Sequence, residues 1–163
     1  MEFLDRVSHL LNKVFIWIAG IFLAAMVLLA CANIFFRFVW VPVRGTFELM
    51  GYFGAVVTAL TLGYTQSKGG HIAVDILVLR FSPKTKRFLL GTNNLICLIF
   101  FALVTWQVTK YARNLWITGE VTETLGIIYY PFTYGVAAGC AVLCLVFFND
   151  FLKTIFNKKE SNK

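Results

Sequence analysis

Four long apolar runs, separated by short polar segments, dominate the pattern of the chain. They cover about residues 14–36, 47–64, 88–108 and 127–148. A helix needs about 20 apolar residues to cross the roughly 30 Å hydrocarbon core of a membrane. Barrel strands would instead alternate apolar and polar residues, which these runs do not. The pattern therefore predicts an all-α integral membrane protein, with four transmembrane helices in a single membrane domain over residues 1–163.

Three flanking segments are amphipathic, because their apolar residues recur at helical spacing and their polar residues take the other face. They lie at residues 3–14, at 71–79 between the second and third runs, and at 151–156 after the fourth. Amphipathic helices of this kind lie in the headgroup plane of a membrane. The central segment is predicted to be interfacial. The two terminal segments either lie in the interface or extend the neighbouring transmembrane helices.

The composition agrees with a lipid environment. Hydrophobic residues make up 59% of the chain and charged residues only 14%, against about 25% charged in a soluble domain. A net charge of +7 is compatible with nucleic-acid binding, but the basic residues stand between and beyond the apolar runs, with no dense patch. They fit contacts with anionic lipid headgroups. Membrane lipids are therefore expected as partners, and nucleic acid is not.

The basic residues are distributed unequally between the two sides of the membrane. With four spans, 11 of the 15 Lys and Arg fall on the side of both termini and 4 on the other. The larger group comprises Arg6, Lys13, Lys68, Arg80, Lys84, Lys86, Arg87, Lys153, Lys158, Lys159 and Lys163, and the smaller Arg37, Arg44, Lys110 and Arg113. Because cytoplasmic segments carry the excess of Lys and Arg, both termini are predicted to be cytoplasmic (N-in, C-in).

Ionisable residues, which ion-coupled carriers place in mid-membrane, are missing from the centres of the predicted spans. The polar residues there are uncharged and are expected to form interhelical hydrogen bonds; they are Asn33, Thr58, Thr61, Asn93, Asn94, Thr105 and Gln107. His9 and His71 lie in the flanks, where they cannot ligate a haem between the helices. The cysteines, all in apolar runs, are expected to act as small hydrophobes. We therefore predict no catalytic, substrate-binding or metal-binding residue, no cofactor and no enzymatic activity.

Two opposite charges flank the first interhelical connection. Arg37 ends the first apolar run and Glu48 opens the second, and Pro42 and Gly45 between them are turn residues. A short hairpin of this kind can bring the two side chains together as a structural ion pair. The alternative is that each side chain simply extends to water at the membrane edge.

Small residues are expected to mark the faces along which helices pack. Gly135 and Gly139 form a GxxxG motif in the fourth run, and Gly51, Gly54 and Ala55 lie near the start of the second. Such positions let helix backbones approach closely. We interpret these faces as candidate interfaces of a subunit that packs against a larger membrane partner.

Several short segments, in this order and spacing, resemble the small membrane subunit (Q-type, DctQ-like) of TRAP transporters, the tripartite ATP-independent periplasmic transporters. They are Asn33–Arg37 (Asn-Ile-Phe-Phe-Arg), Gly45–Glu48 (Gly-Thr-Phe-Glu), Lys68–Asp75 (Lys-Gly-Gly-His-Ile-Ala-Val-Asp) and, more loosely, Thr122–Pro131. The resemblance covers nearly the whole chain. By position it implies structural roles for Arg37 and Glu48 at the outer edge and for His71 and Asp75 in the cytoplasmic motif.

The resemblance implies a transporter of three parts in a bacterial inner membrane. A periplasmic protein captures an organic anion, and a separate large subunit of the elevator type carries it with sodium ions. The small subunit is then a non-catalytic scaffold. Dicarboxylates, sialic acids, other sugar acids and sulfonates all fit, since specificity would lie in the other subunits. The alternative is a self-associating four-helix secondary transporter, in which small-residue faces meet across a homodimer.

The predicted orientation is testable with single cysteines on a cysteine-free background. A cysteine at Gly119 should react with a membrane-impermeant reagent added to whole cells, because the connection between the third and fourth runs is predicted to be periplasmic. A cysteine at Ser82 should react only after the cells are permeabilised. Labelling of Ser82 in intact cells would overturn the orientation.

Overall fold

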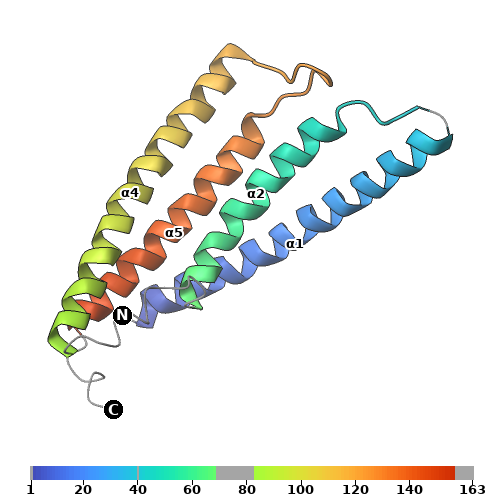
Figure 1. Cartoon of the computed structure of the whole chain (residues 1–163). Coiled ribbons are helices and arrows are strands. Elements are labelled where there is room, and N and C mark those ends of the chain that lie inside the picture. The colour runs from blue at the N-terminus through green and yellow to red at the C-terminus, as the bar shows by residue number, and fades with distance from the viewer. Residues whose placement is uncertain (1, 40, 69–82, 157–163) are drawn as a thin grey trace.

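The computed structural model describes residues 2–39, 41–68 and 83–156, which form four helices (Figure 1). The helices are α1 (Glu2–Val39), α2 (Thr46–Ser67), α4 (Pro83–Thr118) and α5 (Tyr130–Phe156). Each is long and apolar enough to cross a membrane. In these residues the only β-structure is an isolated bridge between Val121 and Ile128. The prediction of an all-α membrane protein with four spans is therefore confirmed.

The helices extend beyond the apolar runs that predicted them. The amphipathic segment at 3–14 continues directly into α1, and that at 151–156 continues α5. Of the two interpretations of the terminal segments, extension of the spans is the one found. The central segment at 71–79 lies outside the described residues.

The end of α4 shows why the apolar pattern underestimates helix length. The predicted span ends near residue 108, but the helix continues to Thr118. It stops where Gly119 adopts a left-handed φ of 66° and its N–H donates to the Leu115 carbonyl at 3.1 Å. Glycine in this conformation is a common helix terminus. Hydrophobicity marks where a helix lies in lipid, whereas the capping residue marks where the helix ends.

The four helices lie side by side in the order α4, α5, α2, α1 (Figure 1). Besides the contacts between neighbours, α1 makes a smaller contact with α5. In the most apolar 18-residue window of each helix, 44% of the residues are buried in α5 and 28% in α2, against 6% in α1 and none in α4. The chain is thus close to a single layer, with two central helices and two edge helices.

Small residues set the spacing of the central helices. A Cβ placed on Gly139 of α5 would lie 2.5 Å from the backbone C and O atoms of Ala59 in α2. Gly63 of α2 is similarly close to α1, since a Cβ there would lie 2.7 Å from the Asn12 Oδ1 atom. These approaches are possible only because glycine has no side chain. Gly139 thus brings the α5 backbone against the α2 backbone, whereas Gly63 leaves room for the Asn12 side chain of α1.

Aromatic and branched side chains fill the junction of α1, α2 and α5. Ala19, Val56 and Leu60 form the buried centre, and Phe15, Phe22, Phe132 and Val136 pack around it. The Phe22 ring meets the Phe53 ring edge-on at 5.2 Å between centroids, an arrangement favoured between aromatic rings. The core therefore lies in the layer's α1–α2–α5 part, and α4 is attached along α5.

The close contact at Gly139 predicts a selective loss of stability. Gly139→Ala should destabilise the chain by about 1–3 kcal/mol, because the methyl group collides with the Ala59 backbone. Gly135→Ala is the matched control in the same motif, since its Cβ would lie 3.5 Å from the Val56 side chain, an ordinary contact. Thermal unfolding in mild detergent distinguishes the two variants. Equal midpoints would show that α5 and α2 do not approach at Gly139.

Candidate functional site: the loop clamp and the open helix faces

The connection between α4 and α5 is a compact hairpin, residues 119–129, organised by Thr122. The Thr122 N–H donates to the Ile127 carbonyl at 2.9 Å, and its hydroxyl oxygen accepts from the Ile127 N–H at 3.2 Å. The Gly126 N–H donates to the Thr122 carbonyl at 3.0 Å, with Gly126 at φ 62°. Thr122 is only 5% exposed. The hairpin thus has its own hydrogen-bonded framework.

Tyr129 joins the base of this hairpin to α2. Its hydroxyl donates to Glu120 Oε2 at 2.8 Å, and this bond to a carboxylate raises the pKa of the Tyr129 phenol above its ordinary value. The ring stacks on Tyr52 of α2 at 5.4 Å, and Tyr52 stacks on Phe132 of α5 at 5.6 Å. A short aromatic stack therefore connects the hairpin with both central helices.

The connection between α1 and α2 is fixed by two polar side chains. The Val43 N–H donates to Asn33 Oδ1 of α1 at 3.0 Å. The hydroxyl of Thr46, which is 2% exposed, donates to the Val43 carbonyl at 2.8 Å. Gly45, at φ 71°, caps the start of α2. The loop is therefore folded back against α1.

The two connections grip each other through Gly45 and Glu48; we call these residues, with Thr124 and Leu125, the loop clamp. Glu48 Oε1 accepts from the Thr124 backbone N–H at 2.8 Å, across 76 residues of sequence. The Leu125 side chain lies over Gly45 in the space where a Cβ would stand. Gly45 thus satisfies two demands, a left-handed turn and room for Leu125.

Arg37 takes no part in the clamp. Its side chain is exposed, and among the described residues the Glu48 carboxylate binds the hairpin rather than Arg37. Of the two alternatives for these charges, the ion pair is therefore not found. Glu48 Oε2 is buried without a hydrogen-bond partner in the described part of the chain. Sequence reasoning selected Glu48 but missed Thr124 and Leu125, its actual neighbours.

The remaining predicted site residues separate into two groups. Gly135 and Gly139 both face α2 of the same chain, where Gly139 meets the Ala59 backbone. Both glycines of this motif therefore pack inside the chain. His71 and Asp75 lie outside the described residues.

The hydroxyl groups within the spans mostly bind their own helix. Thr58 donates to the Gly54 carbonyl at 2.8 Å and Thr105 to the Phe101 carbonyl at 2.8 Å. The sequence predicts that these threonines form hydrogen bonds between helices, but both donate within their own helix. Thr105 Oγ1 also lies 3.8 Å from Cys144 Sγ across the α4–α5 interface. Because a hydroxyl can reach a carbonyl one turn earlier, it is satisfied without a neighbour.

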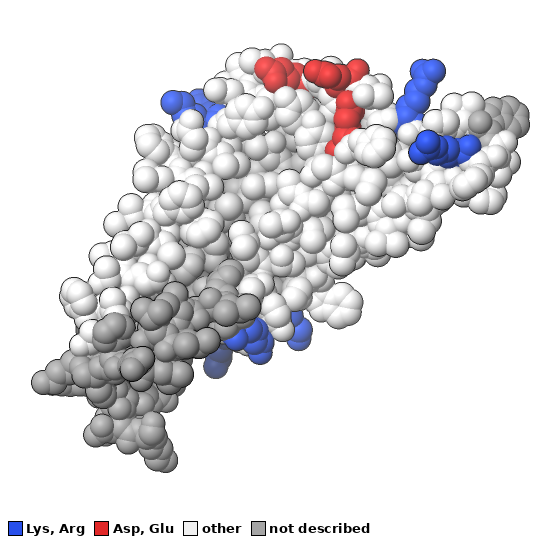
Figure 2. Space-filling view, in the orientation of Figure 1, with Lys and Arg blue, Asp and Glu red and all other residues white. Residues whose placement is uncertain are grey.

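The charged side chains gather at the two ends of the layer (Figure 2). The loop end carries the clamp's Glu48; the opposite end, where α1 begins and α5 ends, holds a bond from Gln66 Nε2 to Asp150 Oδ2 at 3.2 Å. In the described residues, no group of three or more His, Cys, Asp and Glu is placed to hold a metal ion. The cysteines are free thiols, with Cys140 buried and Cys31 exposed on α1.

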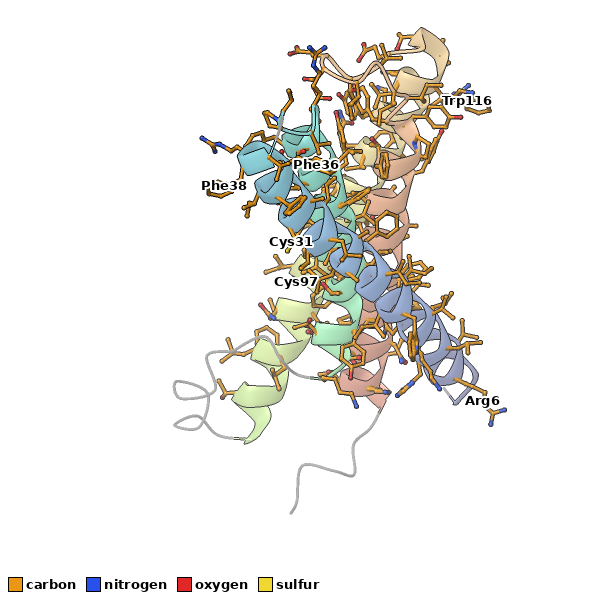
Figure 3. All side chains as sticks on the ribbon, turned by 90° about the vertical axis from the view of Figure 1, so that its right-hand side faces the viewer. Arg6, Cys31, Phe36, Phe38, Cys97 and Trp116 are labelled. Atoms are coloured by element: carbon orange, nitrogen blue, oxygen red, sulfur yellow. The ribbon has the colours of Figure 1, made fainter. Side chains whose placement is uncertain are left out.

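Large apolar side chains project outward from the edge helices. Figure 3 shows Phe38 at the end of α1 and Trp116 on α4 directed away from the other helices, and 88% of Phe38 is exposed. Similar exposed side chains recur along these helices, among them Trp17, Ile21, Leu28 and Phe35 of α1 and Ile96, Phe100, Leu103 and Trp106 of α4. Surfaces of this kind suit contact with lipid chains.

The exposed side of α2 is different. Gly51, Ala55 and Thr58 are exposed on one side of the helix, and no heavy atom lies within 4 Å of a Cβ placed on Gly51 or Gly54. We call these four residues the open α2 face. The only large apolar side chain strongly exposed on described α2 is Phe47, at its start. The open α2 face therefore carries small side chains, whereas the exposed faces of α1 and α4 carry large apolar ones.

Comparison with known proteins gives one match. The family model for "Tripartite ATP-independent periplasmic transporters, DctQ component" matches residues 26–157, which include α2, α4, α5, all residues of the loop clamp and the C-terminal part of α1. No curated protein and no solved structure matches the chain.

The loop clamp predicts that Glu48 holds the hairpin and Arg37 does not. Glu48→Ala should lower the thermal midpoint in detergent and speed amide hydrogen exchange in residues 119–129, since the Thr124 N–H loses its acceptor. Glu48→Gln keeps an acceptor oxygen and should lose less. Arg37→Ala should leave both measurements unchanged, so the double variant should behave like Glu48→Ala alone. Non-additive effects of the two substitutions would restore the ion pair.

Proposed function

The chain belongs to the DctQ family of tripartite ATP-independent periplasmic transporter components, and on this premise we propose that it is a non-catalytic scaffold subunit. It braces a separate large membrane subunit of the elevator type, which carries an organic anion with sodium ions. A soluble periplasmic protein delivers the anion. The complex resides in the inner membrane of a bacterium.

The observation that carries this proposal is the single layer of helices. A carrier needs a site within the membrane, usually lined by polar or ionisable groups between helices. The described helices stand side by side, and the hydroxyls of Thr58 and Thr105 bind carbonyls of their own helices. A layer of this kind suits a frame better than it suits a substrate path. It provides a broad, firmly packed wall in the bilayer.

The proposed orientation places the loop clamp at the periplasmic surface. It is supported by the uneven distribution of Lys and Arg, since the larger group lies on the side of both termini. The clamp then fixes the edge of the scaffold that faces the periplasmic protein. Arg37, extended at this level, contacts water and headgroups.

We assign the contact with the large subunit to the open α2 face. Of the four spans, α2 has the lowest mean hydropathy. Nevertheless, only 28% of the residues in its 18-residue apolar segment are buried within the chain, against 44% in α5. A weakly apolar helix with Gly51 and Ala55 exposed, and with open space beside Gly54, is poorly matched to lipid and well matched to close helix packing. A transmembrane helix of the large subunit fits this face better than lipid chains do.

The alternative, a self-associating transporter, has less support. It needs a small-residue face that meets its copy across a homodimer. Gly139 lies against Ala59 within the same chain, so the GxxxG motif is not available for that contact. The open α2 face remains free for either partner, and transport measurements distinguish the two functions.

The scaffold function predicts that the chain transports nothing alone. Reconstituted in liposomes with an inward sodium gradient and the periplasmic protein, it should take up no labelled dicarboxylate, sialic acid, other sugar acid or sulfonate. Addition of the large subunit to the same preparation should give sodium-dependent uptake of one of them. Uptake by this chain alone would contradict the scaffold function and favour the homodimeric transporter.

The partner face is tested by a bulky substitution with matched controls. Ala55→Trp should reduce co-purification with the large subunit, because overfilling a packed helix contact costs about 1–3 kcal/mol, which lowers the affinity about 5- to 150-fold. Ala24→Trp on α1 and Ala102→Trp on α4, at positions that are also exposed, should co-purify normally. Each variant is first checked for an unchanged thermal midpoint. Loss of the partner in a control variant, with Ala55→Trp unaffected, would move the interface to an edge helix.

A further inference from the structure

We draw no further inference here: the strongest candidate, the buried Glu48 Oε2 atom beneath the α4–α5 hairpin, belongs to the loop clamp already described, and nothing in the described residues shows a ligand that it would bind.

Discussion

The contact between Gly139 and Ala59 is the constraint on which the layer depends, because it sets the distance between the two central helices. In lipid, association gains little from the hydrophobic effect and relies on dense van der Waals packing. Backbones that touch provide many such contacts. Gly63 of α2 leaves room for the Asn12 side chain of α1, and α4 extends the layer beside α5. Larger side chains at these positions would separate the helices.

The loop clamp solves a second problem, which arises because the layer is made of two hairpins. α1 and α2 form one, and α4 and α5 the other. Gly139 joins them within the membrane, and Glu48 and Leu125 join them at the loop end. Gln66 and Asp150 add a bond at the opposite end. Because the two hairpins contact each other at these three levels, they should resist sliding past each other and moving apart.

The sequence predicts those features that depend on the solvent. Lipid demands long apolar helices, so four spans follow from the hydrophobic pattern alone. Features that depend on which residues of the folded chain come into contact do not follow from this pattern. The Thr124 N–H that binds Glu48 lies 76 residues away and carries no sequence signal of its own. Likewise, Gly139 marks a close contact, but its spacing does not say whether the neighbour is in the same chain. Only the fold assigns it to Ala59.

The placement of the polar groups explains why the proposed role depends on helix packing and not on polar or ionisable side chains. Thr58 and Thr105 direct their hydroxyls to carbonyls of their own helices, so these groups are already satisfied in lipid. Glu48, buried in part, holds a loop. What the chain still offers to a partner is the open α2 face, where Gly51 and Ala55 leave room for another backbone. The proposed scaffold role therefore depends on how closely another helix can pack on this face, and not on a reactive or ion-binding group.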